Sequence, residues 1–493
     1  MFKKVLIANR GEIAVRIIRA CRELGIHTVT VYSTADKHAL HAKIADEAVC
    51  IGPAATKDSY LNAAAIIEAC KMTGAEAVHP GFGFLSENAD FAELCLKNNI
   101  VFIGPRPESI RMLGDKAAAK ETMKAAGVPV IPGSDGAVPD MEAAKKLCKE
   151  IGCPLMVKAS AGGGGRGIRL VEHPEDLEAA ITAAKQEALN FFGNDEVYME
   201  KFIVNPKHIE VQILADSYGN TVYLGERDCS MQRRNQKVLE ETPSPIMTPE
   251  LRAKMGKAAV AAAKACGYTN AGTIEFLVDA DRNFYFMEMN TRIQVEHPVT
   301  EEITGIDLVE LQFNIAAGRK LPLRQSQIHL NGWSIECRIN AEDVQAGFSP
   351  SIGVIRQLRL PQGNHIRIET GIAPGSEITP FFDSMVAKLI VTGDTREQAI
   401  ERTLSALERF HVKGIRTTIP FCKAVLHNET YRNGDFDTSF IETRLHSTVW
   451  REPHEELLAA LFAVYTYTHE NTPEIGPDTQ IDPWVLNKRI RNL

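Results

Sequence analysis

Short apolar segments alternate with helical segments in the first hundred residues, and this alternation limits the fold more than any other feature of the sequence. KVLIA, residues 4–8, is a continuous apolar run, as in a strand that is buried on both faces. Residues 12–25 carry apolar side chains at helical spacing and end at a glycine. HTVTVYS, residues 27–33, predicts the next strand, and similar helix–strand pairs continue to residue 105. The pattern predicts a parallel α/β sheet.

The first turn of this segment argues against a common function of such sheets. It contains only Gly11, so the GxGxxG fingerprint of a dinucleotide site is missing where it should stand. We expect this first domain to end near Gly114.

Strands cluster in the middle of the chain instead of alternating with helices, which predicts antiparallel sheets and an α+β region. A helix there has Thr248 as its N-cap, Pro249 at its first position and Gly267 as its terminator. Another strand-rich segment runs from about residue 330 to 393, and a helix follows at 395–410. The middle strands are predicted at 153–160, 167–172, 196–203, 208–216, 221–228, 271–278 and 283–290.

Charge and cysteine content narrow the class of protein. The chain of 493 residues carries 55 Lys and Arg against 63 Asp and Glu, a net charge of -8, which disfavours binding to nucleic acid or to anionic membranes. No apolar run approaches the ~20 residues that a membrane helix requires, and the apolar run near the start is too short for a signal peptide. The ten cysteines form no CxxC pair, which is typical of thiols in a reducing cytosol. We expect a cytoplasmic enzyme.

A glycine-rich strip, VKASAGGGGRGIRLV at residues 157–171, lies between two predicted strands. GGGGRG formally matches GxGxxG, but a strand follows it and not a helix, so a dinucleotide site is disfavoured. Glycine amides without Cβ atoms can close over phosphates, and Lys158 at the end of the preceding strand favours that interpretation. The alternative is a hairpin that is mobile and binds nothing.

Lys116 suggests a second phosphate contact. In GDKAAAKETMKAAG, Asp115 is the predicted N-cap and Lys116 the first helical residue. A cation there opposes the helix dipole, and it makes more sense if the lysine and the helix N-terminus bind one anion together. A solvated surface lysine is the alternative.

Two carboxylates and an amide are predicted on neighbouring strands of one hairpin. Glu275 lies in the first strand, and Glu288 and Asn290 share one face of the second strand. Such oxygen ligands suit Mg²⁺ or Mn²⁺ beside substrate phosphates. Without a metal ion, we expect the two acids to repel each other and one pKa to rise.

Dense polar residues follow this hairpin in otherwise apolar sequence. Arg292 could clamp a planar anion through two hydrogen bonds, and Glu296 is a candidate general base. Gln294 and His297 complete the run.

Two further charged groups have functional and structural interpretations. Arg227, Arg233, Arg234 and Lys237 form a basic cluster, or else a solvated charge run. Glu336, Arg338 and Asn340 share one face of a strand, where a single buried salt bridge would also account for the arginine. A Walker A motif and the kinase signatures are missing, so the phosphate-binding groups suggest ATP held between two antiparallel sheets.

Six blocks together closely resemble biotin carboxylase, an ATP-grasp ligase. They are IANRGEIAVRIIRACRELGI, HPGFGFLSEN, KASAGGGGRGIR, ERDCSMQRRNQKV, EMNTRIQVEHPVTE and ECRINAED, and the resemblance extends from residue 2 to about 445. It implies an ATP-grasp fold of mixed α/β and α+β class. The implied parts are an N-terminal Rossmann-like domain (1–114), an ATP-grasp domain (115–330) with a mobile glycine-rich lid at about 131–203, a C-terminal antiparallel-sheet domain (331–446) and a tail (447–493).

The resemblance also implies ligands and residue roles. Bicarbonate would be deprotonated, phosphorylated by ATP to carboxyphosphate, and its CO₂ transferred to biotin under the closed lid. For ATP the implied residues are Lys116, Lys158, Gly163, Gly164, Gly165, Glu200, Lys201, Phe202, Ile203, His208, Gln232 and Asn235; for Mg²⁺ or Mn²⁺ they are Glu275, Glu288 and Asn290. For bicarbonate they are Lys237, Arg292, Gln294 and the Val295 backbone, with Glu296 as general base, Arg338 stabilising the biotin enolate and Phe82 near the biotin.

Two residues depart from the pattern of many relatives. Asn235 stands where they have histidine, and Phe82 where they have tyrosine. Asn235 can still bind a ribose hydroxyl, so we expect altered ATP affinity and not its loss, whereas Phe82 keeps an apolar ring but lacks a hydroxyl.

The carboxyl acceptor is less constrained. The chain has no Met-Lys-Met turn that would carry biotin, so biotin must arrive on a partner chain, a biotinylated carrier or carboxyltransferase subunit. The tail, with a predicted amphipathic helix at 453–470, resembles that of the free-standing biotin carboxylase subunit in two-subunit pyruvate carboxylases. The alternatives are the biotin carboxylase subunit of an acetyl-CoA or acyl-CoA carboxylase, a different ATP-grasp ligase, and a regulatory ATP-binding protein without catalytic activity. The family implies a homodimer.

Overall fold

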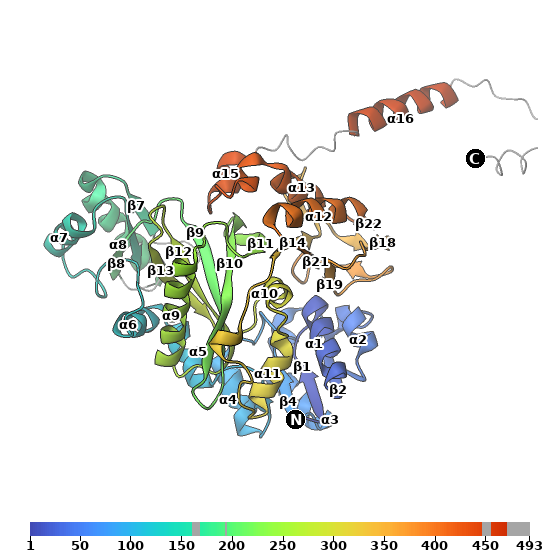
Figure 1. The fold of residues 1–493 in the computed structure, drawn as a ribbon, viewed down its shortest axis with the longest axis horizontal. Helices are drawn as coiled ribbons and strands as arrows, with labels where there is room; N and C mark the ends of the chain where they lie inside the picture. The colour runs from blue at the N-terminus through green and yellow to red at the C-terminus, as the bar shows by residue number, and fades with distance from the viewer. Residues whose placement is uncertain (160–167, 193–194, 446–454, 471–493) are drawn as a thin grey trace, which may run out of the picture. The chain divides into compact units, whose positions relative to one another are not determined.

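The computed structural model describes residues 1–159, 168–192, 195–445 and 455–470. The chain forms two compact units, Met1–Ser447 and Thr448–Leu493. Figure 1 shows the elements of the first unit, from the blue N-terminal sheet to the orange helices near its end.

A five-stranded parallel sheet forms the N-terminal part, as the alternating pattern predicts. Its order is β3-β2-β1-β4-β5, and every neighbouring pair is parallel. The short strand β3 and helix α2 are additional to the predicted elements. The elements are β1 (Lys4–Ile7), α1 (Gly11–Glu23), β2 (His27–Ser33), α2 (Leu40–Ile44), β3 (Glu47–Gly52), α3 (Ala63–Thr73), β4 (Ala77–His79), α4 (Ala89–Lys97), β5 (Val101–Phe102) and α5 (Pro107–Gly114).

Both faces of this sheet are apolar, which accounts for the continuous apolar run in β1. Val5 and Ile7 pack into one core with α1, while Leu6 and Ala8 pack into another with α3 and α4. Successive side chains of a strand point to opposite faces, so a strand covered on both sides must be apolar throughout.

An eight-stranded sheet of order β13-β12-β9-β10-β11-β14-β21-β19 forms the centre of the first unit, and all of its neighbouring strands are antiparallel. It crosses the predicted domain boundary at residue 330, because β11 pairs with β14. The strands are β9 (Lys207–Ala215), β10 (Thr221–Arg233), β11 (Gln236–Thr242), β12 (Asn270–Val278), β13 (Phe284–Asn290), β14 (Trp333–Asn340), β19 (Ile366–Thr370) and β21 (Met385–Gly393).

The two faces of this larger sheet differ in character. Helix α9 (Pro249–Ala265), with the predicted Thr248 cap, packs on the apolar face against Ile209, Val211 and Ile274. On the other face, His208, Glu210 and Gln212 alternate with those apolar residues along β9 and are buried. Helices α10 (His297–Thr304) and α11 (Leu308–Ala316) follow the sheet's β13 strand in the chain.

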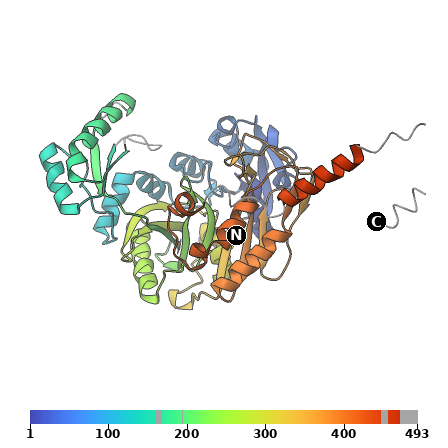
Figure 2. The ribbon, with the colours of Figure 1, turned by 90° about the horizontal axis from the view of Figure 1, so that it is seen from above.

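A small separate layer carries the predicted lid. The order β7-β6-β8 includes the predicted hairpin, with Lys158 opposite Ile168. The layer has its own apolar core, including Leu155, Val157 and Val197, and its helices at 141–151 and 177–192 stand apart from the central sheet in Figure 2. Gly163, Gly164 and Gly165 lie outside the described residues. The elements of the layer are α7 (Met141–Ile151), β6 (Leu155–Ala159), β7 (Ile168–Val171), α8 (Leu177–Phe192) and β8 (Val197–Lys201). Helix α6 (Lys116–Ala125), which precedes them in the chain, packs into the core of the central sheet through Ala119 and Met123.

The remaining elements include α12 (Arg396–Arg409), α13 (Ile419–His427), α14 (Glu429–Arg432) and α15 (Phe440–Arg444). Small two-stranded pairs join β15 (Glu342–Asp343) to β16 (Ser349–Pro350), β17 (Gly353–Val354) to β20 (Glu377–Ile378), and β18 (Gln357–Arg359) to β22 (His411–Lys413). In the second unit, helix α16 (Glu455–Glu470) lies within the predicted tail helix. Among the described residues, no helix combines the length and apolar character that a membrane crossing requires.

Candidate active site

One cavity of about 770 Å³ gathers most of the predicted site residues. They come from segments far apart in the sequence: the loop after β4, the central strands β9 to β14, and the residues before α10. The predicted residues that line it are Phe82, His208, Gln232, Asn235, Lys237, Glu275, Glu288, Asn290, Arg292, Gln294, Val295, Glu296 and Arg338.

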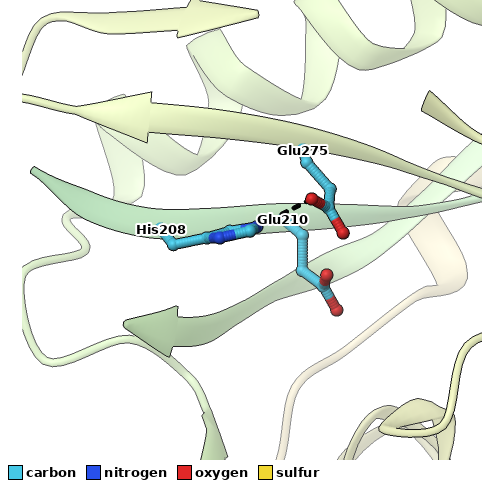
Figure 3. Close-up of side chains that lie close together, drawn as sticks. All are labelled: His208, Glu210 and Glu275. Carbon is cyan, nitrogen blue, oxygen red and sulfur yellow. Dashed lines mark ion pairs between the residues drawn. The ribbon is translucent and has the colours of Figure 1, made fainter. Parts of the chain in front are cut away.

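Strand register brings the first acidic group together. Glu275 on β12 lies opposite Glu210 on β9 on one side and opposite Glu288 on β13 on the other. His208, two residues before Glu210, lies on the same face, and its Nε2 is 2.9 Å from Glu275 Oε2. Figure 3 shows His208, Glu210 and Glu275 converging from the two strands.

Glu275 is surrounded by hydrogen-bond donors. Its Oε1 accepts hydrogen bonds of 2.8 Å from Lys237, Asn290 and Gln294. Burial alone would raise the pKa of Glu275, but Lys237 and His208 outweigh it and hold that pKa well below the usual value. Of the two acids, Glu275 is therefore not the one that carries the raised pKa that we expected.

Lys237 links three buried carboxylates. Its Nζ lies 2.7 Å from Glu210, 2.8 Å from Glu275 and 2.7 Å from Glu296. Burial disfavours the ammonium, yet Glu210 and Glu296 outweigh burial and hold the pKa of Lys237 well above its usual value. The lysine is therefore a fixed cation at the centre of the cavity wall.

Glu296 lies between two cations. Besides Lys237, it accepts a hydrogen bond of 3.0 Å from Arg338. Burial opposes ionisation of this carboxyl, but Lys237 and Arg338 dominate and hold its pKa well below the usual value. In this state Glu296 is an ionised carboxylate with an open cavity beside it.

Arg338 forms buried salt bridges, which was one of the two interpretations that the sequence offered for this residue. Its side chain also lines the cavity. Arg338 Nε donates to Glu240 Oε1 at 2.6 Å. Glu240 on β11 lies opposite Glu336 on β14, and both are fully buried. Burial raises the pKa of Glu240 to about 7, and burial together with Glu240 raises that of Glu336 well above its usual value. An acid pair that resists ionisation thus lies behind Arg338.

The predicted basic cluster does not exist as a unit. Arg227 and Lys237 are buried in the charged face of the sheet, so the prediction of a solvated charge run is wrong for them. Arg233 lies over the Phe348 ring at 3.8 Å. Arg234 and Asn235 form the two-residue turn between β10 and β11, with φ of 49° and 62°.

Arg227 organises the floor of the site. Its side chain is fully buried and forms an ion pair with Glu210. It also donates to Gln294 Oε1 at 2.8 Å, which fixes the amide that in turn donates to Glu275. Its other hydrogen-bond acceptors are Gln212, Thr273 and Thr300.

Arg292 also lines the cavity, but it is held by Glu87 and Asn290 and not by the carboxylates that pair with Lys237. Its Nε donates to Glu87 at 3.0 Å and its Nη2 to Asn290 Oδ1 at 2.9 Å. Phe82 enters the cavity from the N-terminal part, where Asn9 donates to its carbonyl oxygen at 2.8 Å.

Among the other predicted ATP residues, Lys158 and Glu200 to Ile203 are described by the structure and do not line this cavity. Lys158 pairs with Glu200 at 2.7 Å, and Lys120, which the sequence did not single out, pairs with the same carboxylate at 2.9 Å. Lys201 ends β8, and Phe202 and Ile203 follow it. Lys116 begins α6 behind Asp115, whose Oδ1 accepts from the Ala118 amide at 3.1 Å as a cap does, but the Lys116 side chain lies outside the described part.

Some residues that hold the cavity side chains in place escaped sequence reasoning, among them Glu210 and Glu240, the partners of Lys237 and Arg338. Glu210 carries a recognisable signal, because His208, Glu210 and Gln212 are polar residues at every second position of an otherwise apolar strand. Glu240 carries no such signal, since it is one acid in a mixed segment and its role depends on which strand pairs with β11.

Hard oxygen atoms at the predicted metal site fit Mg²⁺ or Mn²⁺. Glu275 and Glu288 lie opposite each other on neighbouring strands, and Asn290 lies two residue pairs further along. Two other groups, His208 with Glu210 and Glu275, and Glu210 with Cys229 and Glu296, also place ligand atoms close together. Lys237 pairs with Glu210 in both groups and also with Glu275 of the predicted site, so an ion in any of the three would compete with that ammonium.

Family models match three consecutive segments of the chain. Residues 1–110 match the biotin carboxylase N-terminal domain, and residues 336–443 match the biotin carboxylase C-terminal domain. Residues 115–324 between them match the ATP binding domain of the carbamoyl-phosphate synthase L chain.

Curated and solved relatives agree with these matches. Biotin carboxylase 1 of Bacillus subtilis is 56% identical over 444 residues, covering 90% of this chain and 99% of the relative. The 2-oxoglutarate carboxylase small subunit of Hydrogenobacter thermophilus is 52% identical over 471 residues, covering 95% of this chain and 100% of the relative.

Two crystal structures extend the comparison. The biotin carboxylase domain dimer of the Hydrogenobacter enzyme, solved with MgADP, ADP and bicarbonate, has 53% identity and a TM-score of 0.83, covering 92% of this chain and 99% of that one. The biotin carboxylase subunit of a pyruvate carboxylase has 52% identity and a TM-score of 0.83, covering 92% and 100%. The fold, the charged cavity and these matches agree, and the chain belongs to the biotin carboxylase family of ATP-dependent ligases with the ATP-grasp fold.

Proposed function

We propose that this protein is the biotin carboxylase subunit of a two-subunit carboxylase whose final acceptor is a 2-oxo acid, with pyruvate as the first candidate. The tail carries this proposal. The alignment with the Hydrogenobacter small subunit covers 95% of the chain, so it must extend beyond residue 446. The alignment with the Bacillus biotin carboxylase covers 444 residues, no more than the part that precedes the tail. The solved biotin carboxylase subunit of a pyruvate carboxylase favours the same acceptor class.

The chemistry proposed for the cavity begins with bicarbonate. Arg292, Gln294, the Val295 amide and Lys237 bind the anion beside Glu296. Lys237 and Arg338 then divide their charge between bicarbonate and Glu296, so the pKa of the Glu296 carboxyl rises from its low resting value. The carboxylate takes the bicarbonate proton, and the bicarbonate oxygen attacks the γ-phosphorus of ATP, releasing ADP and forming carboxyphosphate.

The triphosphate is proposed to lie between the lid and the central sheet. Lys116, Lys158, His208 and the lid glycines Gly163 to Gly165 contact phosphates, while Glu200 to Ile203, Gln232 and Asn235 hold the nucleoside. Glu275, Glu288 and Asn290 would hold Mg²⁺ or Mn²⁺, which neutralises phosphate charge when bound. Two of these residues are already joined, because Asn290 donates a hydrogen bond of 2.8 Å to Glu275.

Carboxyphosphate hydrolyses readily, so the lid must exclude water while it exists. Its breakdown gives CO₂ and phosphate beside the biotin of the partner chain. The phosphate takes the proton of the ureido nitrogen of biotin, and that nitrogen then forms its new bond to the carbon of CO₂. Arg338 stabilises the enolate charge that develops on biotin, because its guanidinium is permanently charged and fixed by Glu240. Phe82 offers an apolar ring to the biotin from the N-terminal part of the chain.

Bicarbonate-dependent ADP release tests the chemistry. We expect release by the purified chain with ATP, Mg²⁺ and bicarbonate to rise when free biotin is added. Release that ignores biotin would instead support another bicarbonate-phosphorylating ATP-grasp ligase. Nucleotide binding without release would indicate a regulatory ATP-binding protein.

The tail tests the assignment to a two-subunit enzyme. Helix α16 exposes Leu457, Leu461, Phe462 and Val464, an apolar surface suited to a partner helix or sheet. Deleting residues 447–493 should abolish co-purification with the biotinylated 2-oxo acid carboxylase subunit, whereas carboxylation of free biotin should persist. Unchanged co-purification, or transfer to an acyl-CoA carboxylase carrier in preference, would support the acetyl-CoA or acyl-CoA alternative.

A further inference from the structure

Lys388 is a fully buried lysine behind the cavity wall. It lies on β21, in register with Arg338 on β14 and with Glu369 on β19. Its side chain has an exposed fraction of 0%, and it does not line the cavity, so it cannot touch a substrate. A buried ammonium is costly unless it is paired and hydrogen-bonded, so its partners should explain its presence.

Two partners hold its Nζ. It donates a hydrogen bond of 2.6 Å to the carbonyl oxygen of Val295 and forms an ion pair of 3.1 Å with Glu12 of helix α1. Glu12 is itself buried, and burial raises its pKa despite Lys388. Lys388 therefore joins three separate parts of the chain: the N-terminal helix, the loop before α10 and the C-terminal strand.

The contact to Val295 matters because this residue lies between two proposed bicarbonate contacts. The peptide that follows it leads directly to Glu296, and the peptide that precedes it carries the Val295 amide. The preceding carbonyl, that of Gln294, accepts from His297 Nδ1 at 2.7 Å. A carbonyl oxygen can only accept, so Nδ1 carries the proton, and burial keeps the pKa of His297 well below its usual value.

We propose that Lys388, held by Glu12, is a positioning residue for the bicarbonate pocket. It fixes the peptide between Val295 and Glu296, while His297 fixes the peptide before it, and together they set the direction of the Val295 amide and the Glu296 carboxylate. This inference rests on the proposed roles of Val295 and Glu296. Displacing either group by about 1 Å would misalign the anion and leave the nucleotide contacts on other strands unchanged.

Steady-state kinetics of Lys388→Met in the full chain test the inference. We expect the KM for bicarbonate to rise about tenfold and kcat to fall, with the KM for ATP within about twofold of the parent. If the KM values for ATP and bicarbonate rise together, Lys388 supports the fold in general and the inference is wrong.

The single variant leaves Glu12 buried without its cation, which destabilises the chain. Lys388→Met combined with Glu12→Gln removes both charges, so the melting temperature should recover toward that of the parent. The carbonyl of Val295 still lacks its donor, so the KM for bicarbonate should stay high. A double variant that recovers both the melting temperature and the KM for bicarbonate would overturn the inference.

Arg252→Met with Glu226→Gln is the matched control. This pair is also ion-paired, at 2.7 Å, with Glu226 buried, and neither residue lines the cavity. It should change the melting temperature and leave the KM for bicarbonate within about twofold of the parent. These outcomes can be told apart from a failure of the proposed function. In that case the parent protein itself would show no bicarbonate-dependent ADP release.

Discussion

The two large sheets of this protein both contain buried strands, but one sheet is apolar on both faces and the other carries charged residues on one face. Strand β1 of the parallel sheet reads KVLI, and its residues after Lys4 are fully buried among apolar neighbours on both sides. Strand β9 of the antiparallel sheet reads KHIEVQILA and is buried just as completely, yet every second residue from His208 to Gln212 is polar. Burial is therefore common to both sheets, and only the nature of the second face differs.

The difference shows where the chain places stability and where it places chemistry. Apolar faces gain free energy from leaving water, about 25 cal/mol per Å², and need only shape to do so. The charged face of the antiparallel sheet is buried at a cost, which each charge recovers only through an opposite charge in the correct register. Glu210, Glu275, Arg338 and Lys388 all lie on this face. Because burying these charges costs free energy, we infer that this face is used to bind a ligand.

Glu296→Gln should give the largest effect on the charged side of the comparison. The amide keeps the shape of the side chain but cannot take a proton, so bicarbonate-dependent turnover should fall about 10²–10⁴-fold. ATP binding, measured by calorimetry, should remain, because Glu296 pairs with Lys237 and Arg338 and is not among the residues proposed to contact ATP or its metal ion. Turnover within a few-fold of the parent would refute the general-base role.

Ile7→Ala should weaken the apolar core of the parallel sheet and leave the active site unchanged. Ile7 is fully buried in the central strand β1, so its truncation should lower the free energy of unfolding by about 2–5 kcal/mol. The KM values for ATP and bicarbonate of the protein that remains folded should match those of the parent. Denaturant unfolding and steady-state kinetics on the same preparation measure both quantities. Altered KM values would mean that the two sheets are not separable in this way.

Glu336→Gln tests the charged face through the pH dependence of the melting temperature, and we expect the smallest effect from this variant. The folded-state pKa of Glu240 is about 7 and that of Glu336 is also raised, so protonation is favoured in the folded chain. Their contribution to stability is thus complete below pH 4.5 and decreases as pH rises toward about 7. Glutamine imitates the protonated acid, so the variant's melting temperature should decrease less than the parent's between about pH 5 and 7. Parallel curves for the two proteins would contradict the raised pKa of Glu336.

Local patterns determined the elements on both sides of this comparison. The apolar runs predicted the parallel strands, and Asp115, Thr248 and Gly267 marked helix ends where the structure has them. The blocks resembling biotin carboxylase indicated the family, which the comparisons confirm. The roles given to Glu275, Arg292 and Glu296 remain predictions, although the structure brings all three to one cavity.

Tertiary structure alone decided which charges meet. Arg338 lies 98 residues from Glu240 in the sequence, and they meet because β11 pairs with β14. Lys388 lies 93 residues from Val295, and they meet because α10, which the loop of Val295 precedes, packs against β21. The sequence established that polar residues stand in buried strands, since that follows from periodicity within one segment. Strand register between distant segments decided their partners, and with them every pKa in the cavity, because Coulomb energies depend on distances in space and not on separation along the chain.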